Sequence, residues 1–225
     1  MATQLDLEEQ EQLDQLKAFW KQYGTLVTWV LIIALGAFVA WNRWQAWQRD
    51  QGEKAASLYD EVDRAVQAGD ADVAARVFAD MKERYPRAAF THQAGLLTAR
   101  IELDKSRADS ARASLAWVAE QAGDDEYRAI AHLRLAGLLL DEKKYDEALK
   151  QVDAVAAGAF AALAADRRGD VLLAQGKGEQ AKAAYRIAWN DMDPKVEYRR
   201  LIEAKLDVLG AAPAASAASA PEAAK

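Results

Sequence analysis

The sequence predicts an all-α protein in which a single N-terminal transmembrane helix precedes an α-solenoid of about four helical hairpins and a C-terminal capping helix. Three observations predict this fold. One uncharged apolar segment is long enough to cross a bilayer, an alanine-centred pattern recurs four times after it, and only 4 prolines and 12 glycines interrupt the 225 residues. Few helix breakers and abundant alanine favour packed helices over sheets.

The predicted transmembrane helix covers residues 23–44. From Gly24 to Ala40 the 17 residues are uncharged, and Tyr23 and Trp41 extend the apolar segment to 19. At a rise of about 1.5 Å per residue, such a segment spans roughly 28 Å, close to the thickness of a bilayer's hydrocarbon core. Aromatic residues flank it, as is typical of membrane interfaces. They are Trp20, Tyr23, Trp41, Trp44 and Trp47.

Two alternatives for this segment are a buried helix of a soluble core and a cleaved signal peptide. A core helix would carry a polar stripe, and a signal peptide would have a basic leader and small residues at its cleavage site. The leader here is acidic, and the bulky Trp41–Trp44 sequence follows the uncharged run Gly24–Ala40. We therefore expect an uncleaved anchor, in which Gly36 and Ala40 form a small-xxx-small step suited to packing against another transmembrane helix.

The domain plan predicted from these patterns has four parts. Residues 1–22 form an N-terminal segment, either an interfacial or partner-binding helix or a solvated extension of the anchor. Residues 23–44 form the span, 45–210 the repeat domain, and 211–225 a disordered tail rich in Ala, Pro and Ser. Basic residues lie on both sides of the span, so their count does not decide its orientation.

The repeat domain contains four blocks that share one layout. Each predicts a helix, a tight polar turn and a second helix, in which an alanine is followed four residues later by a larger apolar residue. The alanines are 37, 37 and 33 residues apart. A small residue lets two helices approach closely, and the larger residue fills the adjoining groove. The pairs are Ala74 with Phe78, Ala111 with Leu115, Ala148 with Val152, and Ala181 with Tyr185.

Turns and a final helix complete the predicted solenoid. Polar turns are expected at 69–70, 107–109, 142–144 and 176–178. Residues 195–209 predict a helix that covers the otherwise exposed end of the stack. The apolar residues on or near one side of this helix are Val196, Leu201, Ile202, Leu206 and Leu209.

The layout resembles the tetratricopeptide repeat, whose period is about 34 residues. The fourth block matches best, with Gly169 and Leu172 on its first helix and Ala181 and Tyr185 on its second, whereas the first two blocks match loosely. In that family the first helices line an inner groove. The resemblance implies a partner-binding groove, for which ordinary solvated positions and packing between repeats are the alternative. Its candidate residues are Tyr59, Asp63, Arg100, Asp166 and Asp170.

Composition and motifs argue against catalysis and nucleic-acid binding. The formal net charge is −6, and the chain has no cysteine, which excludes thiol chemistry and disulfides. His92 and His132 fit no metal-ligand spacing, and we expect both on a helix surface or in a groove. No serine-nucleophile motif or phosphate-binding loop occurs. The sequence predicts a non-enzymatic protein with no cofactor, no metal and no nucleic-acid partner.

A closer resemblance is carried by the approach to the membrane and by the closing helix. The segments are Glu9–Leu13, Leu16–Gly24, Trp41–Trp44, Ala55–Tyr59 and Leu201–Leu209. They resemble the ancillary subunit family of the bacterial SecYEG translocon, also called the YfgM family. The alanine-rich tail departs from the family pattern.

The resemblance implies an inner-membrane protein with a short cytoplasmic N-terminus and a periplasmic tetratricopeptide-like domain. It also implies association with the SecYEG translocon and with the periplasmic chaperone PpiD, contact with the lipid bilayer through one span, and hand-over of secretory nascent chains to periplasmic chaperones. Two other functions stay open. One is a scaffold for another cell-envelope complex, and the other is a regulatory tether whose repeat domain is cytoplasmic.

Overall fold

The computed structural model describes residues 7–155 and 158–212, and these residues form nine α-helices and no strand. The all-α prediction is confirmed. The chain divides into two compact units, Met1–Gln51 and Gly52–Lys225. The helices are α1 (Leu7–Gln67), α2 (Ala71–Arg84), α3 (Ala89–Asp104), α4 (Ala108–Gln121), α5 (Asp125–Asp141), α6 (Tyr145–Asp153), α7 (Ala161–Ala174), α8 (Gly178–Asp191) and α9 (Tyr198–Val208).

α1 is one helix of 61 residues that includes the predicted span and continues into the Gly52–Lys225 unit. Between Trp20 and Gln67 it contains an 18-residue window with a mean hydropathy of 2.1, of which only 6% is buried. A helix of a soluble core would be mostly buried, so this exposure favours a membrane span. Within the apolar segment the Thr28 hydroxyl donates a 2.8 Å hydrogen bond to the carbonyl oxygen of Gly24, which satisfies a polar group away from water.

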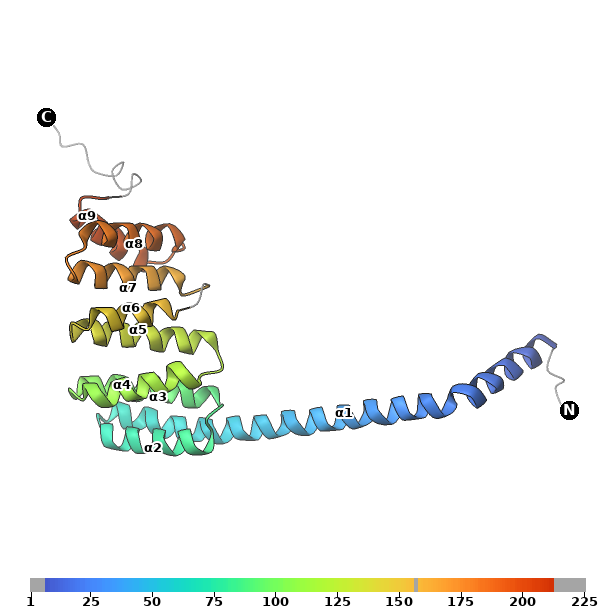
Figure 1. Cartoon of the computed structure of the whole chain (residues 1–225). Coiled ribbons are helices and arrows are strands. Elements are labelled where there is room, and N and C mark those ends of the chain that lie inside the picture. Colours follow the sequence, from blue (N-terminus) through green and yellow to red (C-terminus); the bar gives the residue numbers. More distant parts are fainter. Residues whose placement is uncertain (1–6, 156–157, 213–225) are drawn as a thin grey trace. The chain divides into compact units, whose positions relative to one another are not determined.

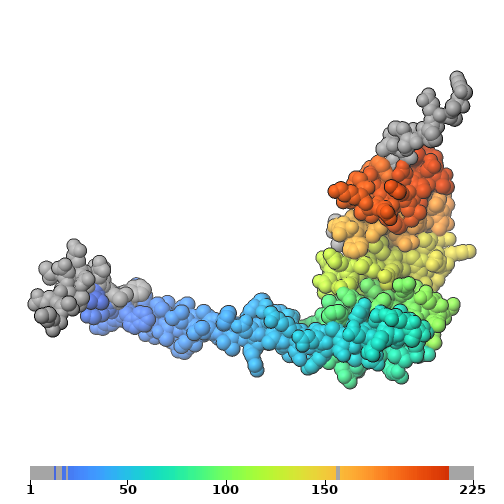
Figure 2. Space-filling model, turned by 180° about the vertical axis from the view of Figure 1, so that it is seen from behind, coloured from blue at the N-terminus to red at the C-terminus, as the bar shows by residue number. Residues whose placement is uncertain are grey.

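In the Gly52–Lys225 unit the helices stack as successive hairpins (Figure 1). α3 packs on α4, α5 on α6 and α7 on α8, and each hairpin also contacts the next. The C-terminal part of α1 forms the first hairpin with α2, since Ala55, Val62 and Ala65 share one apolar cluster with α2 residues. The space-filling view shows successive segments of this unit as bands in sequence order, from cyan to red (Figure 2). This is the predicted solenoid of four hairpins.

The predicted anchor pairs form the helix crossings of this solenoid. All four alanines are completely buried, and their larger partners expose at most 2% of their surface. The pairs therefore occupy equivalent positions in the four hairpins, although the first two blocks match the repeat pattern loosely. The sequence spacing of small and large residues predicted these contacts because both residues of a pair lie on one helix face.

All four hairpin turns share one backbone motif. In each, one residue adopts a left-handed conformation, and the N–H of the next residue donates to a carbonyl oxygen five residues earlier, as in a Schellman motif. The left-handed residues are Gly69 (φ 73°), Ser106 (φ 60°), Lys143 (φ 60°) and Gly176 (φ 76°). The predicted turns are confirmed, except that Ala108, Asp109 and Gly178 already belong to the following helices.

The capping helix α9 is shorter than the predicted 195–209, and two of the five apolar residues expected on or near one side of it are exposed. Ile202 and Leu206 are completely buried, whereas Val196 is 43% exposed and Leu201 is 49% exposed. Val196 precedes α9. Leu201 is turned about 100° around the helix from its neighbour Ile202, which carries it off the buried side. Of the predicted tail, residues 213–225 lie outside the described residues.

His92 is buried, which corrects the expectation of a surface or groove position. Its side chain is 2% exposed, and its ring centroid lies 5.9 Å from that of Trp117 and 6.1 Å from that of Tyr127. Nε2 donates a 3.1 Å hydrogen bond to the carbonyl oxygen of Pro86, and Nδ1 has no partner among the described residues. Burial lowers the pKa of His92. His132 is half-buried on α5.

We expect His92 to make the repeat domain less stable in mild acid. Below pH of about 6.5 the unfolded chain takes up a proton on this residue that the folded chain does not, so the free energy of unfolding falls as the pH falls. The nearby Asp124 carboxylate reduces this effect but does not reverse it. Urea unfolding at about pH 5.5 and about pH 7.5, roughly one unit on either side of the ordinary histidine pKa, measures the change in the free energy of unfolding.

The variant His92→Gln should lose part of this pH dependence, because glutamine still donates to the Pro86 carbonyl but does not titrate. His132→Gln, measured in parallel, is the matched control for the loss of a histidine. If the free energy of unfolding of His92→Gln differed between the two pH values as much as that of the original chain, His92 would not be the source of the pH dependence.

Candidate partner-binding surface

The first helices of three successive hairpins line a groove with a volume of about 680 Å³. α5 contributes one helix face, because its lining residues recur at spacings of three and four. α3 and α7 form the two sides. The lining residues are Leu103 from α3, Ile130, Leu133, Arg134, Gly137, Leu138 and Asp141 from α5, Phe160 before α7, and Leu163 and Arg167 from α7.

A smaller pocket of about 260 Å³ adjoins this groove, because Leu103 and Arg134 line both. It also contains Arg100, one of the predicted site residues, and Asp104. Leu103 is 40% exposed despite its apolar side chain. The two pockets therefore form one surface, here called the α3/α5 groove, in which an exposed leucine separates charged side chains.

Three arginines and two aspartates line the α3/α5 groove. Arg134 Nη1 donates a 2.9 Å hydrogen bond to the carbonyl oxygen of Leu96, which ties α5 to α3. Burial and the positive charge of Arg100 lower the pKa of Arg134. In the described part of the chain, no acidic group forms an ion pair with either arginine. Arg167 Nη1 lies 3.4 Å from Asp170 Oδ2.

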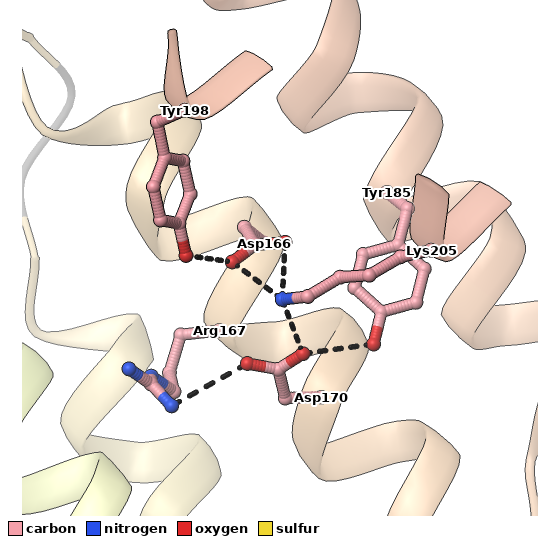
Figure 3. A network of polar contacts seen from close by, with 6 residues as sticks. All are labelled: Asp166, Arg167, Asp170, Tyr185, Tyr198 and Lys205. Atoms are coloured by element: carbon pink, nitrogen blue, oxygen red, sulfur yellow. Dashed lines mark hydrogen bonds and ion pairs between the residues drawn. The ribbon is translucent and has the colours of Figure 1, made fainter. Parts of the chain in front are cut away.

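The structure places Asp166 and Asp170 in a polar network with α8 and α9 (Figure 3). Asp166 is 1% exposed, and Lys205 Nζ lies 2.8 Å and 2.9 Å from its two carboxylate oxygens. The same ammonium lies 2.7 Å from Asp170 Oδ1. Tyr198 donates a 2.8 Å hydrogen bond to Asp166, and Tyr185 donates a 2.9 Å hydrogen bond to Asp170.

This network, here called the cap network, joins the last hairpin to the capping helix. Burial and the neighbouring carboxylates raise the pKa values of Tyr185 and Tyr198, so both hydroxyls stay protonated and act as donors. Asp166, one of the residues predicted for the partner-binding groove, thus contacts Tyr198 and Lys205 of α9. Lys205 was not among the predicted site residues, and its local sequence carries no signal for an acidic partner that lies 39 residues earlier in the chain.

The other predicted site residues lie outside the α3/α5 groove. Tyr59 is half-buried on α1, and its ring centroid lies 5.6 Å from that of Phe90. Asp63 accepts a 2.7 Å hydrogen bond from Gln67 one turn later. In the Met1–Gln51 unit, Gly36 and Ala40 are both exposed on α1. Of the predicted groove residues, Arg100 lines the α3/α5 groove.

Acidic residues begin α5. Asp125 and Glu126 occupy its first turn, where negative charge complements the helix dipole. Arg128 bonds to Asp125. Among the residues that the structure describes, no group of three or more His, Asp or Glu side chains has an arrangement that holds a metal ion.

Comparison with known proteins gives matches over most of the chain. Residues 17–211 match the family model of the tetratricopeptide repeat-like domain. A protein of Neisseria gonorrhoeae named ancillary SecYEG translocon subunit is 33% identical over 205 residues, which are 90% of this chain and 98% of that protein. An Escherichia coli protein of the same name is 29% identical over 180 residues, which are 79% of this chain and 85% of that protein.

Proposed function

Because the chain belongs to the ancillary SecYEG translocon subunit family, whose tetratricopeptide repeat-like domain covers residues 17–211, we propose that it is a SecYEG-associated inner-membrane protein that binds partner proteins. One observation carries the proposal. α1 contains the candidate membrane span and continues, without a non-helical linker, into the first hairpin of a solenoid. Such a chain suits recruitment of proteins to a membrane complex, because stacked repeats offer an extended binding surface.

The finer parts of the proposal concern orientation and partners. The N-terminus is cytoplasmic, and the repeat domain is periplasmic. There it binds the chaperone PpiD and assists the hand-over of secretory chains from SecYEG to periplasmic chaperones, without a catalytic step. Within the span, Gly36 and Ala40 offer a narrow face for a translocon helix, which their exposure on α1 supports.

The test uses the full chain with an affinity tag after Lys225. Protease added to spheroplasts should remove the tagged domain, because a periplasmic domain is accessible once the outer membrane is opened. Purification in mild detergent should recover SecYEG and PpiD. The test variant carries Gly36→Leu and Ala40→Leu, which keep the span apolar but fill its narrow face. This variant should recover less SecYEG than the original chain.

Other outcomes point to other functions. A domain that stays protected in spheroplasts would be cytoplasmic, which would contradict the proposed orientation. Recovery of other envelope proteins in place of SecYEG would contradict the translocon assignment and favour a scaffold in another complex.

A further inference from the structure

The outer side of the capping helix α9, at the C-terminal end of the stack, carries an exposed apolar stripe (Figure 1). Leu201, Ala204 and Val208 form it, and their spacings of three and four place them within an arc of about 60° around the helix. Leu201 is 49% exposed and Val208 is 85% exposed. Because a helix that ends a repeat stack in water needs a polar outer side, this stripe indicates an interaction surface.

Two opposite charges flank the stripe on the same side. Arg200 and Asp207 are seven residues apart on α9, so they lie within about 20° of each other around the helix. Both side chains are exposed, and neither forms an ion pair among the described residues. The midpoint between them falls beside Ala204, which is also near the middle of the stripe.

This arrangement is complementary to itself. In an antiparallel pair of α9 helices with Ala204 near the two-fold axis, Leu201 of each copy faces Val208 of the other. Arg200 of each copy then faces Asp207 of the other, and both ion pairs fall on one side of the helix pair. A parallel pair would place each charge opposite its own copy, and like-charge repulsion disfavours that arrangement.

The other charged groups near the stripe do not oppose this pairing. Glu197 lies one turn before Leu201, at a level where an antiparallel partner helix has already ended. Glu203 is turned about 100° around the helix from Ala204. Lys205 is held in the cap network. The stripe and its two flanking charges therefore suit a second copy of the same helix.

We propose that α9 binds α9 of a second copy of this chain as an antiparallel pair, through the stripe and through ion pairs between Arg200 and Asp207. This inference goes beyond the proposed function and does not depend on SecYEG. One helix face is a small interface, and small interfaces are weak between proteins in dilute solution. A candidate membrane span confines each copy to a membrane, which raises the effective concentration, so the pairing is tested in membranes.

The test uses single-cysteine variants, because the chain itself has no cysteine. After oxidation in native membranes, Ala204→Cys should form a disulfide-linked dimer, since residue 204 lies close to the two-fold axis. Leu201→Cys should form much less, because the antiparallel pair separates the two copies of this residue by about 9 Å along the helix axis. Ala79→Cys, which replaces an exposed alanine on α2, is the matched control and should form little dimer.

Charge variants in the Ala204→Cys background test the ion pairs. Arg200→Asp alone and Asp207→Arg alone should each lower the initial rate of disulfide formation about tenfold, because two ion pairs become two like-charge contacts. The double variant exchanges the charges and should restore the rate. An effect on the reactivity of the thiol alone would shift the two single variants in opposite directions. Arg76→Asp, at an exposed position of α2, should leave the rate unchanged.

Several results would overturn the proposal. They are equal dimer formation by Ala204→Cys and Ala79→Cys, a charge exchange that does not restore the rate, and capture of a different protein by Ala204→Cys in place of a second copy. Removal of residues 213–225 should leave the rate unchanged, and a large increase would show that the tail covers the stripe instead. Recovery of SecYEG is measured separately, so failure of either proposal leaves the other standing.

Discussion

Replacing Lys205 by methionine is expected to lower the free energy of unfolding by about 3 kcal/mol. The ammonium lies within 2.9 Å of both Asp166 carboxylate oxygens and 2.7 Å from Asp170 Oδ1. Its removal leaves the Asp166 carboxylate without a cation, while Asp170 keeps only Arg167 at 3.4 Å, and the Asp166 side chain is only 2% exposed. Urea unfolding followed by circular dichroism measures the loss.

The matched control is Lys182→Met on α8. Lys182 pairs with Glu179, whose side chain is 87% exposed, so this variant should lose much less stability than Lys205→Met. A second variant, Asp166→Asn with Lys205→Met, should be more stable than Lys205→Met alone, because it no longer buries an unpaired charge. If Lys205→Met and Lys182→Met lowered the free energy of unfolding equally, the cap network would contribute no more to stability than a surface ion pair.

The cap network shows what periodicity in the sequence leaves undetermined. The pattern predicted that residues 195–209 cover the end of the stack, and α9 does so with Ile202 and Leu206. It did not predict that Lys205 meets Asp166, because the two residues are 39 positions apart and belong to different helices. Helical periodicity assigns a residue to a face, but the neighbour that this face meets depends on how the helices pack.

The α3/α5 groove could not be predicted for the same reason. Arg100 was a candidate from its position on a first helix, but Arg134 and Phe160 come from other hairpins and reach one groove only through stacking. The turns were easier, since a polar residue or glycine in a left-handed conformation ends a helix locally. Local chemistry therefore predicted the hairpins, and packing between hairpins determined the site.

Substituting Gly169 by alanine is the second change with a large expected effect. A Cβ atom there would lie 2.4 Å from Cε1 and 2.5 Å from Cδ1 of Tyr185, far inside normal contact distance. The Tyr185 ring is 1% exposed, and its hydroxyl is held by Asp170, so it has little room to move. Overpacking should lower the free energy of unfolding by about 3 kcal/mol, and the better helix propensity of alanine should offset about 1 kcal/mol of this. The expected net loss is about 2 kcal/mol.

Gly137→Ala is the control with the opposite expected sign. Gly137 also lies inside a first helix, α5, but a Cβ there would meet only Arg167 at 3.8 Å, an ordinary contact. This variant should gain up to about 1 kcal/mol from helix propensity. Combining Gly169→Ala with Tyr185→Leu should cost less than the sum of the two single changes, because the smaller side chain makes room for the added methyl group. Strict additivity, or a stabilised Gly169→Ala, would mean that α7 and α8 do not cross as closely as the 2.4 Å approach requires.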